Sequence, residues 1–220
     1  MNGVQNCFII MPIYKQFVKI RVKMQNIKDA VRKKLLETGR RLVCEKGVEY
    51  LTARKLSEAS ECSIGTIYNQ FGNMDEFVAE QNEQTLGELA RCLHREPQSG
   101  SPYHNLTTGL DIWLQFVQNN HRLWLLLYNF HLNTPELCLS VAYRRQMLAL
   151  MKTVAPDFVL LTPKLSAGQR QLALKVLLTS LFAFSSLLVT EAPINVATAE
   201  NCRLLFNTYL AGLKKLDGEN

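Results

Sequence analysis

A short run of polar and small side chains has the chemistry needed to contact DNA bases. Asn69 and Gln70 carry carboxamides, which can pair bidentately with adenine in a major groove. Gly65 lacks a Cβ and so permits a close backbone approach to another molecule, and Thr66 and Tyr68 add hydroxyl groups. Each residue alone also suits an ordinary helix surface or core. Their combination at this spacing favours a helix that contacts DNA.

Two predicted N-caps place this run on the second of two short helices. Thr52 can cap a helix that starts at about Ala53, and Ser63 can cap the next one. In that second helix Ile64, Ile67 and Phe71 recur at i, i+3 and i+7, which predicts a buried stripe. The segment 52–71 therefore has the layout of a helix-turn-helix motif.

Two cations occupy the first turn of the first short helix. Arg54 and Lys55 oppose the helix macrodipole there, at a cost of roughly 0.3 kcal/mol each. The same position becomes favourable when the helix end faces a phosphate, because the free N–H groups and both cations then point at one anion. We therefore expect this end to contact the DNA backbone.

The motif resembles the N-terminal module of the TetR family of bacterial transcriptional regulators. The resemblance covers about 27–78 and rests on Thr52, Arg54, Ser63, Gly65, Thr66, Ile67, Tyr68 and Phe71. It implies an all-α protein with a three-helix, homeodomain-like DNA-binding domain at 24–73 and a helical effector-binding and dimerisation domain at 74–220. The resemblance and the residue chemistry described above together predict DNA contacts at Thr52, Arg54, Lys55, Ser63, Gly65, Thr66, Tyr68, Asn69 and Gln70.

Three positions depart from the family pattern. Glu61 lies in the turn where the family usually has Gly, Gln70 replaces a common His or Tyr, and Met74 replaces a frequent phosphate-contacting Lys. The first departure bears on the geometry of the turn. The other two predict a shifted base preference and one fewer contact with the DNA backbone.

Charge is concentrated in the same part of the chain. Residues 1–72 hold 13 Lys or Arg against 6 Asp or Glu, a balance of +7, whereas residues 73–220 hold 12 against 13, a balance of −1. A domain that displaces counterions from a polyanion has this distribution, and its binding depends strongly on salt. The nearly neutral remainder argues against a generally basic protein.

Residues 1–23 form a basic and apolar extension without a clear pattern. Its apolar block is broken by Pro12 and follows no positive region, which disfavours a signal peptide or a membrane span. Two interpretations stay open: a mobile or disordered arm that reaches DNA, or translation that begins at Met24. The second is slightly favoured.

The sequence after residue 73 predicts helices only. Asn73 caps a helix through residue 95, with Glu76 three positions on as in a capping box. The later helices are expected at 104–119, 120–132, 135–154, 168–191 and 197–216. Pro135 and the stretches 155–168 and 191–195 are expected to separate them, because each disfavours a continuing helix.

The last two predicted helices have the composition of a dimer interface. The segment 172–189 is apolar on nearly all faces, but Lys175 and four hydroxyl residues disfavour a membrane span. By the family resemblance, the helices at 168–191 and 197–216 would form a homodimer. The alternative is that they only close the core of one protomer.

An aromatic-rich set lies between the two ends of the predicted body. Ligand pockets are mostly apolar with a few polar groups, and so are ordinary cores. Each residue alone favours a core, and the family plan raises the expectation that some of them line an effector cavity. The set is Trp113, Phe116, Trp124, Tyr128, Phe130, His131 and Tyr143. The histidines are too scattered to predict a metal site.

Two function classes follow from these features. The first is a DNA-binding regulator, most simply a ligand-responsive repressor that binds a palindrome as a dimer in the cytoplasm. The second is an enzyme or helical scaffold with an incidental helix-turn-helix. No P-loop, HExxH, GxGxxG or nucleophile-elbow motif supports an enzyme, and no cofactor is predicted. The six cysteines lack a CxxC pair and are expected to be reduced core residues.

Overall fold

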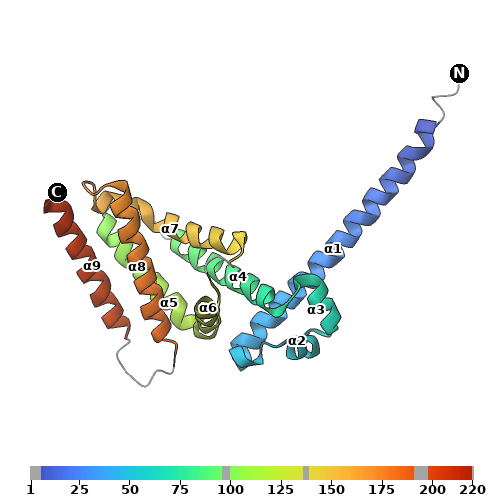
Figure 1. The fold of residues 1–220 in the computed structure, drawn as a ribbon, viewed down its shortest axis with the longest axis horizontal. Coiled ribbons are helices and arrows are strands. Elements are labelled where there is room, and N and C mark those ends of the chain that lie inside the picture. Colours follow the sequence, from blue (N-terminus) through green and yellow to red (C-terminus); the bar gives the residue numbers. More distant parts are fainter. Residues whose placement is uncertain (1–5, 96–99, 136–138, 191–197, 220) are drawn as a thin grey trace.

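The computed structural model describes residues 6–95, 100–135, 139–190 and 198–219, and these residues form helices joined by turns and bends. Figure 1 shows two parts: a domain built on one long helix, and a bundle at the other end of the molecule. We call the first part, formed by α1, η1, α2 and α3, the helix-turn-helix domain. We call α5 to α9 the body. Helix α4 joins them.

Helix α1 spans Asn6–Lys46 without interruption and extends away from the rest of the molecule (Figure 1). The sequence predicts a separate extension at 1–23; residues 1–5 of it lie outside the described part, and 6–23 continue the first helix. A physical reason is that no Gly or Pro lies between residues 13 and 38 to end a helix. Residues 19–30 are all exposed, so no other described part of the chain packs around this stretch.

The small core of the helix-turn-helix domain joins four helices. Beyond the 3-10 turn η1 (Val48–Tyr50), α2 spans Ala53–Ser60 and α3 spans Ile64–Phe71. Their inward side chains pack with α1 and with the first turn of α4. The buried members of this core are Leu35, Leu56, Ile67, Phe71 and Phe77.

Helix α4 (Met74–Arg95) crosses α1 at close range. Asn73 caps it as predicted, because the Asn73 Oδ1 accepts from the backbone N–H of Glu76 at 2.8 Å. At the crossing, a Cβ on Gly39 would lie 2.5 Å from the Phe77 ring, so only glycine allows this approach. The body end of α4 packs mainly against α7.

The body consists of five helices: α5 (Pro102–Asn119), α6 (His121–Asn133), α7 (Val141–Leu161), α8 (Ala167–Leu187) and α9 (Ala199–Glu219). Four of them lie close to the predicted ranges. Serine caps start α5, α7 and α8, and α8 has a full capping box between Ser166 and Gln169. The predicted break at 191–195 lies outside the described residues.

Helix α7 corrects the prediction of a helix at 135–154. It starts six residues later and continues through Pro156 to Leu161, so the expected break at 155 is wrong. Proline removes only one backbone donor. Beyond it Phe158 is 1% exposed and packs in the body core, and Asp157 accepts from the Asn105 side chain at 2.7 Å. These long-range contacts hold the last turns in the helix.

Candidate DNA-binding surface and effector-binding body

Both predicted caps orient the helix-turn-helix. The Thr52 Oγ1 accepts from the backbone N–H of Lys55 at 3.3 Å, and the Ser63 Oγ accepts from that of Thr66 at 3.1 Å. The Thr66 hydroxyl also lies 2.9 Å from the Ser63 Oγ, so it is already engaged. Thr52 and Ser63 therefore set where each short helix begins, and both side chains remain exposed at the surface.

The outer face of α3 is polar and open. Tyr68 is 44% exposed, and Asn69 and Gly65 are exposed, while Gln70 is half-buried. A Cβ on Gly65 would meet only the Ser63 Oγ, at 3.7 Å, so the chain itself does not require glycine there. A glycine in a helix costs about 0.5–1 kcal/mol relative to alanine. That cost is explained if the missing Cβ admits another molecule.

The predicted buried stripe of α3 is only partly correct. Ile67 and Phe71 are buried as expected, but Ile64 is 42% exposed. Ile64 is the first residue of the helix, where the chain has just turned away from α2. Its side chain therefore joins the outer surface beside Gly65 and adds an apolar group to it.

Arg54 and Lys55 share one acidic neighbour. The Glu58 Oε1 accepts from the Arg54 Nε and its Oε2 accepts from the Lys55 Nζ, both at 3.1 Å. The hydrogen bonds from Lys55 and then Arg54 lower the pKa of the Glu58 carboxyl below its usual value. Glu58 therefore stays ionised at neutral pH and competes with phosphate for both cations.

Replacing Glu58 with Gln is expected to raise affinity for duplex DNA about three- to fivefold, because exposed ion pairs are weak and the competing charge disappears. Titration of a fluorescent duplex at fixed salt measures this. Glu49→Gln removes an exposed acid from η1 and is the matched control. Equal gains in both variants would show a general charge effect and exclude competition by Glu58.

Glu61 occupies the turn between α2 and α3 in a left-handed conformation, with φ 57° and ψ 26°. The departure from glycine at this position therefore leaves the turn geometry intact and stores strain. A left-handed conformation costs an L-residue about 1–2 kcal/mol.

Glu61→Gly is expected to increase the free energy of unfolding by about 0.5–1 kcal/mol, since relief of strain exceeds the added freedom of the unfolded chain. Urea denaturation followed by circular dichroism measures the midpoint. Glu61→Ala removes the same charge but keeps the strain, so its midpoint should stay near that of the parent chain. A midpoint that rose equally in both would refute strain as the cause.

Arg32 is a positioning residue that sequence reasoning missed. Its guanidinium pairs with Glu80 of α4 and donates to the Gln70 carbonyl at the end of α3. It also lies over the Phe71 ring, 4.2 Å from the centroid. Arg32 thereby fixes α3 to α1 and α4. Arg32 and Glu80 are 48 positions apart, so no local sequence pattern predicts their ion pair.

Met74 is half-buried and packs against the core of the helix-turn-helix domain. Where the family frequently has lysine, the methionine here therefore adds an apolar contact at the start of α4. The structure supplies a packing role for this residue in addition to the predicted loss of a backbone contact.

The predicted aromatic set is brought together, but as a packed cluster. Trp113 and Trp124 meet edge to face at 5.4 Å, and Phe182 of α8 contacts Trp124, Tyr128 and His131. Phe130 packs on Tyr143. The two indole N–H groups donate to buried Ser185 and Ser186 at 3.1 Å. The sequence analysis did not predict that Phe182 and the two serines pack against the aromatic set. Their only local signal is that they recur at helical spacing on α8.

The polar atoms of this cluster are also engaged. The His131 Nδ1 lies 3.0 Å from the Tyr143 hydroxyl, and burial raises the pKa of that hydroxyl above its usual value. Trp113 borders a small apolar cavity enclosed by α4, α5, α7, α8 and α9, and Phe116 borders a groove of about 500 Å³ between α4 and α5. Phe130 borders a third groove, which lies between α4 and α6. The predicted residues thus serve mainly as a core, and Trp113, Phe116 and Phe130 also line a cavity or groove.

Neither a membrane span nor a metal centre is found within the described ranges. No helix there has the length and apolarity to cross a bilayer, and no three His, Cys, Asp or Glu side chains gather as metal ligands. Cys202 is buried as expected, but Cys44 lies at the surface, so the expectation of core cysteines is wrong for Cys44. Partial desolvation raises the pKa of the Cys44 thiol, and burial raises that of Cys202 to about 11. Both thiols are therefore protonated and weakly reactive at neutral pH.

These features define a helix-turn-helix architecture connected by α4 to an all-helical body, and Val43 of α1 also packs directly against Leu123 and Leu126 of α6. Residues 35–80, which include the motif, match the model of bacterial regulatory proteins of the tetR family. No curated protein matches the sequence significantly. The chain carries a tetR-family N-terminal domain, and its overall fold is that of TetR-family transcriptional regulators.

Solved structures support the fold over most of the chain. The TetR-family repressor FadR of Thermus thermophilus, in complex with lauroyl-CoA, has a TM-score of 0.64 at 18% identity, covering 82% of this chain and 94% of FadR. The TetR-family regulator PfmR, also of Thermus thermophilus, has a TM-score of 0.57 at 16% identity, with coverages of 80% and 97%. The multidrug binding protein EbrR, complexed with ethidium, has a TM-score of 0.54 at 19% identity, with coverages of 81% and 98%.

Proposed function

We propose that this protein is a DNA-binding transcriptional regulator that contacts base edges through α3 and phosphates through the start of α2. The observation that carries the proposal is the outer face of α3, where Gly65, Tyr68 and Asn69 are exposed without a packing role. Thr66 and Gln70 flank them. The excess positive charge of residues 1–72 supports the same assignment.

We further propose a homodimer formed by α8 and α9. Each helix has an inward apolar face in the body core and a second apolar face that remains exposed. The exposed residues are Leu172, Val176, Leu187, Leu204, Leu205 and Leu216. A two-fold dimer would cover them and place two α3 helices for successive major grooves of a palindrome.

The connections of α4 support control by an effector. Arg40 of α1 pairs with Glu88 and donates to the Thr85 hydroxyl at 3.1 Å, and the Gln81 amide donates to the Leu36 carbonyl at 2.6 Å. Movement of α4 relative to the body would therefore carry α1 and α3 with it. FadR and EbrR were crystallised with small molecules, which favours a ligand-responsive repressor.

DNase footprinting on the region upstream of the protein's own gene tests this function. We expect protection of a palindrome whose half-sites lie about 34–36 Å apart, with affinity that falls steeply as salt rises. Protection of a single short half-site would contradict the dimer. Failure to retain the protein on duplex DNA at low salt would refute DNA binding and favour a helical scaffold.

A further inference from the structure

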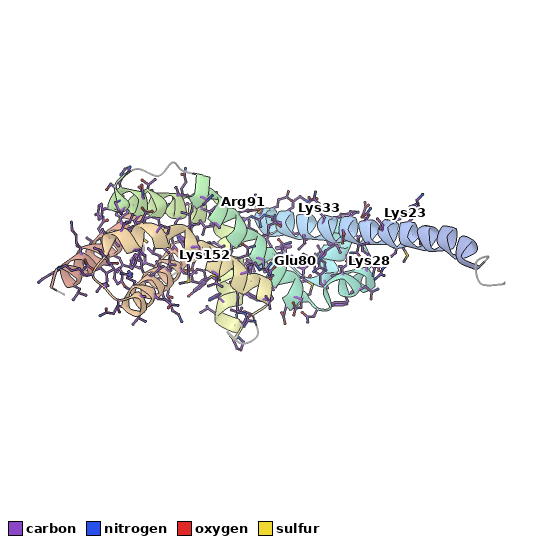
Figure 2. The ribbon with its side chains drawn as sticks, turned by 90° about the horizontal axis from the view of Figure 1, so that it is seen from above. Lys23, Lys28, Lys33, Glu80, Arg91 and Lys152 are labelled. Carbon is purple, nitrogen blue, oxygen red and sulfur yellow. The ribbon has the colours of Figure 1, made fainter. Side chains whose placement is uncertain are left out.

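A groove of about 770 Å³ runs between α4 and α7 and reaches α1. Figure 2 looks onto the molecule from above, with Arg91 and Lys152 toward the body and Glu80 nearer α1. The volume lies in the range of small-molecule sites. The groove shares no lining residue with the aromatic set predicted from the sequence.

Two cations, Arg91 and Lys152, and the His94 imidazole at the body end of the groove are free to bind a ligand. Arg91, His94 and Lys152 line it, and no described carboxylate pairs with any of them. Arg91 uses only its Nε, which donates to the Gly87 carbonyl of its own helix at 3.2 Å. The terminal guanidinium nitrogens and the Lys152 ammonium therefore remain available to an anion.

Acidic side chains at the opposite end are already engaged. Glu80 holds Arg32, and Glu83 accepts from the Ser140 hydroxyl. The Arg32 guanidinium offsets the charge of Glu80, whereas the Ser140 hydroxyl holds Glu83 in place and leaves its charge. The groove is thus electrostatically asymmetric, because its cations without a described carboxylate partner lie at the body end.

Small residues form much of the middle of the groove. Gly87 and Ala90 of α4 face Ala149 of α7, and Leu36 of α1 closes the far end. A Cβ on Gly87 would come within 3.4 Å of the Gln146 carboxamide, an ordinary contact. A larger side chain at Gly87 would therefore narrow the groove while leaving its charged residues in the chain.

We propose that this groove binds an amphipathic anion, with a carboxylate or phosphate head at Arg91, His94 and Lys152 and an apolar portion along Gly87 and Ala149 toward Leu36. Such a ligand would touch α1, α4 and α7 together. If the proposed regulator function holds, on which this consequence rests, the ligand would bias the angle between α1 and α4 and so the spacing of the two α3 helices.

Calorimetric titration of the full chain with decanoate and with decyl phosphate, below their micelle concentrations, tests the site. We expect both anions to bind at least tenfold more tightly than decanol and decyltrimethylammonium. The ratio of the dissociation constants of decanoate and decyl phosphate identifies the preferred head group. Arg91→Glu with Lys152→Glu should weaken anion binding at least tenfold. Lys164→Glu, a charge reversal outside the groove, should leave it unchanged.

A second variant separates the groove from surface charge. Gly87→Leu should weaken decanoate binding at least tenfold while circular dichroism and thermal unfolding show a folded chain. Unchanged anion binding in either groove variant would overturn the proposal, as would equal binding of decanol. Because this titration contains no DNA, a chain that binds decanoate but not its upstream DNA would refute the regulator function and leave the groove assigned.

Discussion

Combined replacement of Arg54 and Tyr68 by Ala is expected to lower affinity for the palindromic site about a thousandfold. A lost base contact costs about 1–3 kcal/mol, and a lost phosphate contact adds to it, so about 2 kcal/mol per protomer is a conservative sum. Two protomers double this loss to about 4 kcal/mol. Fluorescence anisotropy with the footprinted duplex measures the change.

The salt dependence of the single variants separates the two roles. Arg54→Ala should reduce the slope of log affinity against log salt by about one for each protomer, whereas Tyr68→Ala should leave the slope unchanged. Both side chains are exposed, so thermal unfolding should stay close to that of the parent chain. Full DNA affinity in the folded double variant would exclude this surface as the DNA contact.

Leu204→Glu is expected to convert the proposed dimer into monomers and thereby abolish tight binding to the palindrome. Leu204 is 67% exposed on α9, so a glutamate there is tolerated by one protomer. In a two-fold dimer the substitution would bury a carboxylate in each copy, at a cost of several kcal/mol per charge. Sedimentation equilibrium at micromolar concentration measures the shift in mass.

Leu132→Glu is the matched control for the dimer. Leu132 is 65% exposed, nearly the same as Leu204, but it lies on α6 away from the proposed interface. This variant should remain dimeric and bind DNA as the parent does. A parent chain that sediments as a monomer, or a Leu204→Glu variant that stays dimeric, would contradict the interface on α8 and α9.

Features that depend on near neighbours were predictable from the sequence. Thr52, Ser63 and Asn73 cap their helices as expected, because each cap bonds a backbone N–H only three residues away. The tetR-family motif and the all-α fold were likewise recognised from local spacing. The surplus of positive charge in residues 1–72 can be counted directly from the sequence.

Side-chain burial was less predictable, because it depends on partners distant in the sequence. Periodicity assigned Ile64 to a buried stripe, yet the turn after α2 leaves it exposed. Pro156 was expected to end a helix, but contacts of the following turn with the body hold α7 together. The sequence left the aromatic residues between a core and an effector cavity, and only the fold shows that Phe182, Ser185 and Ser186 pack against them.

The sequence by itself determined the motif, its caps, the helical class and the location of positive charge, since these follow from interactions within about four residues. Tertiary structure alone decided that Arg32 joins α3 to α4 and that Arg91 and Lys152 border one groove. Arg32 and Glu80 are 48 positions apart in the sequence, and Arg91 and Lys152 are 61 positions apart. Only the packing of α1, α4 and α7 brings such residues together, and no local pattern encodes that packing.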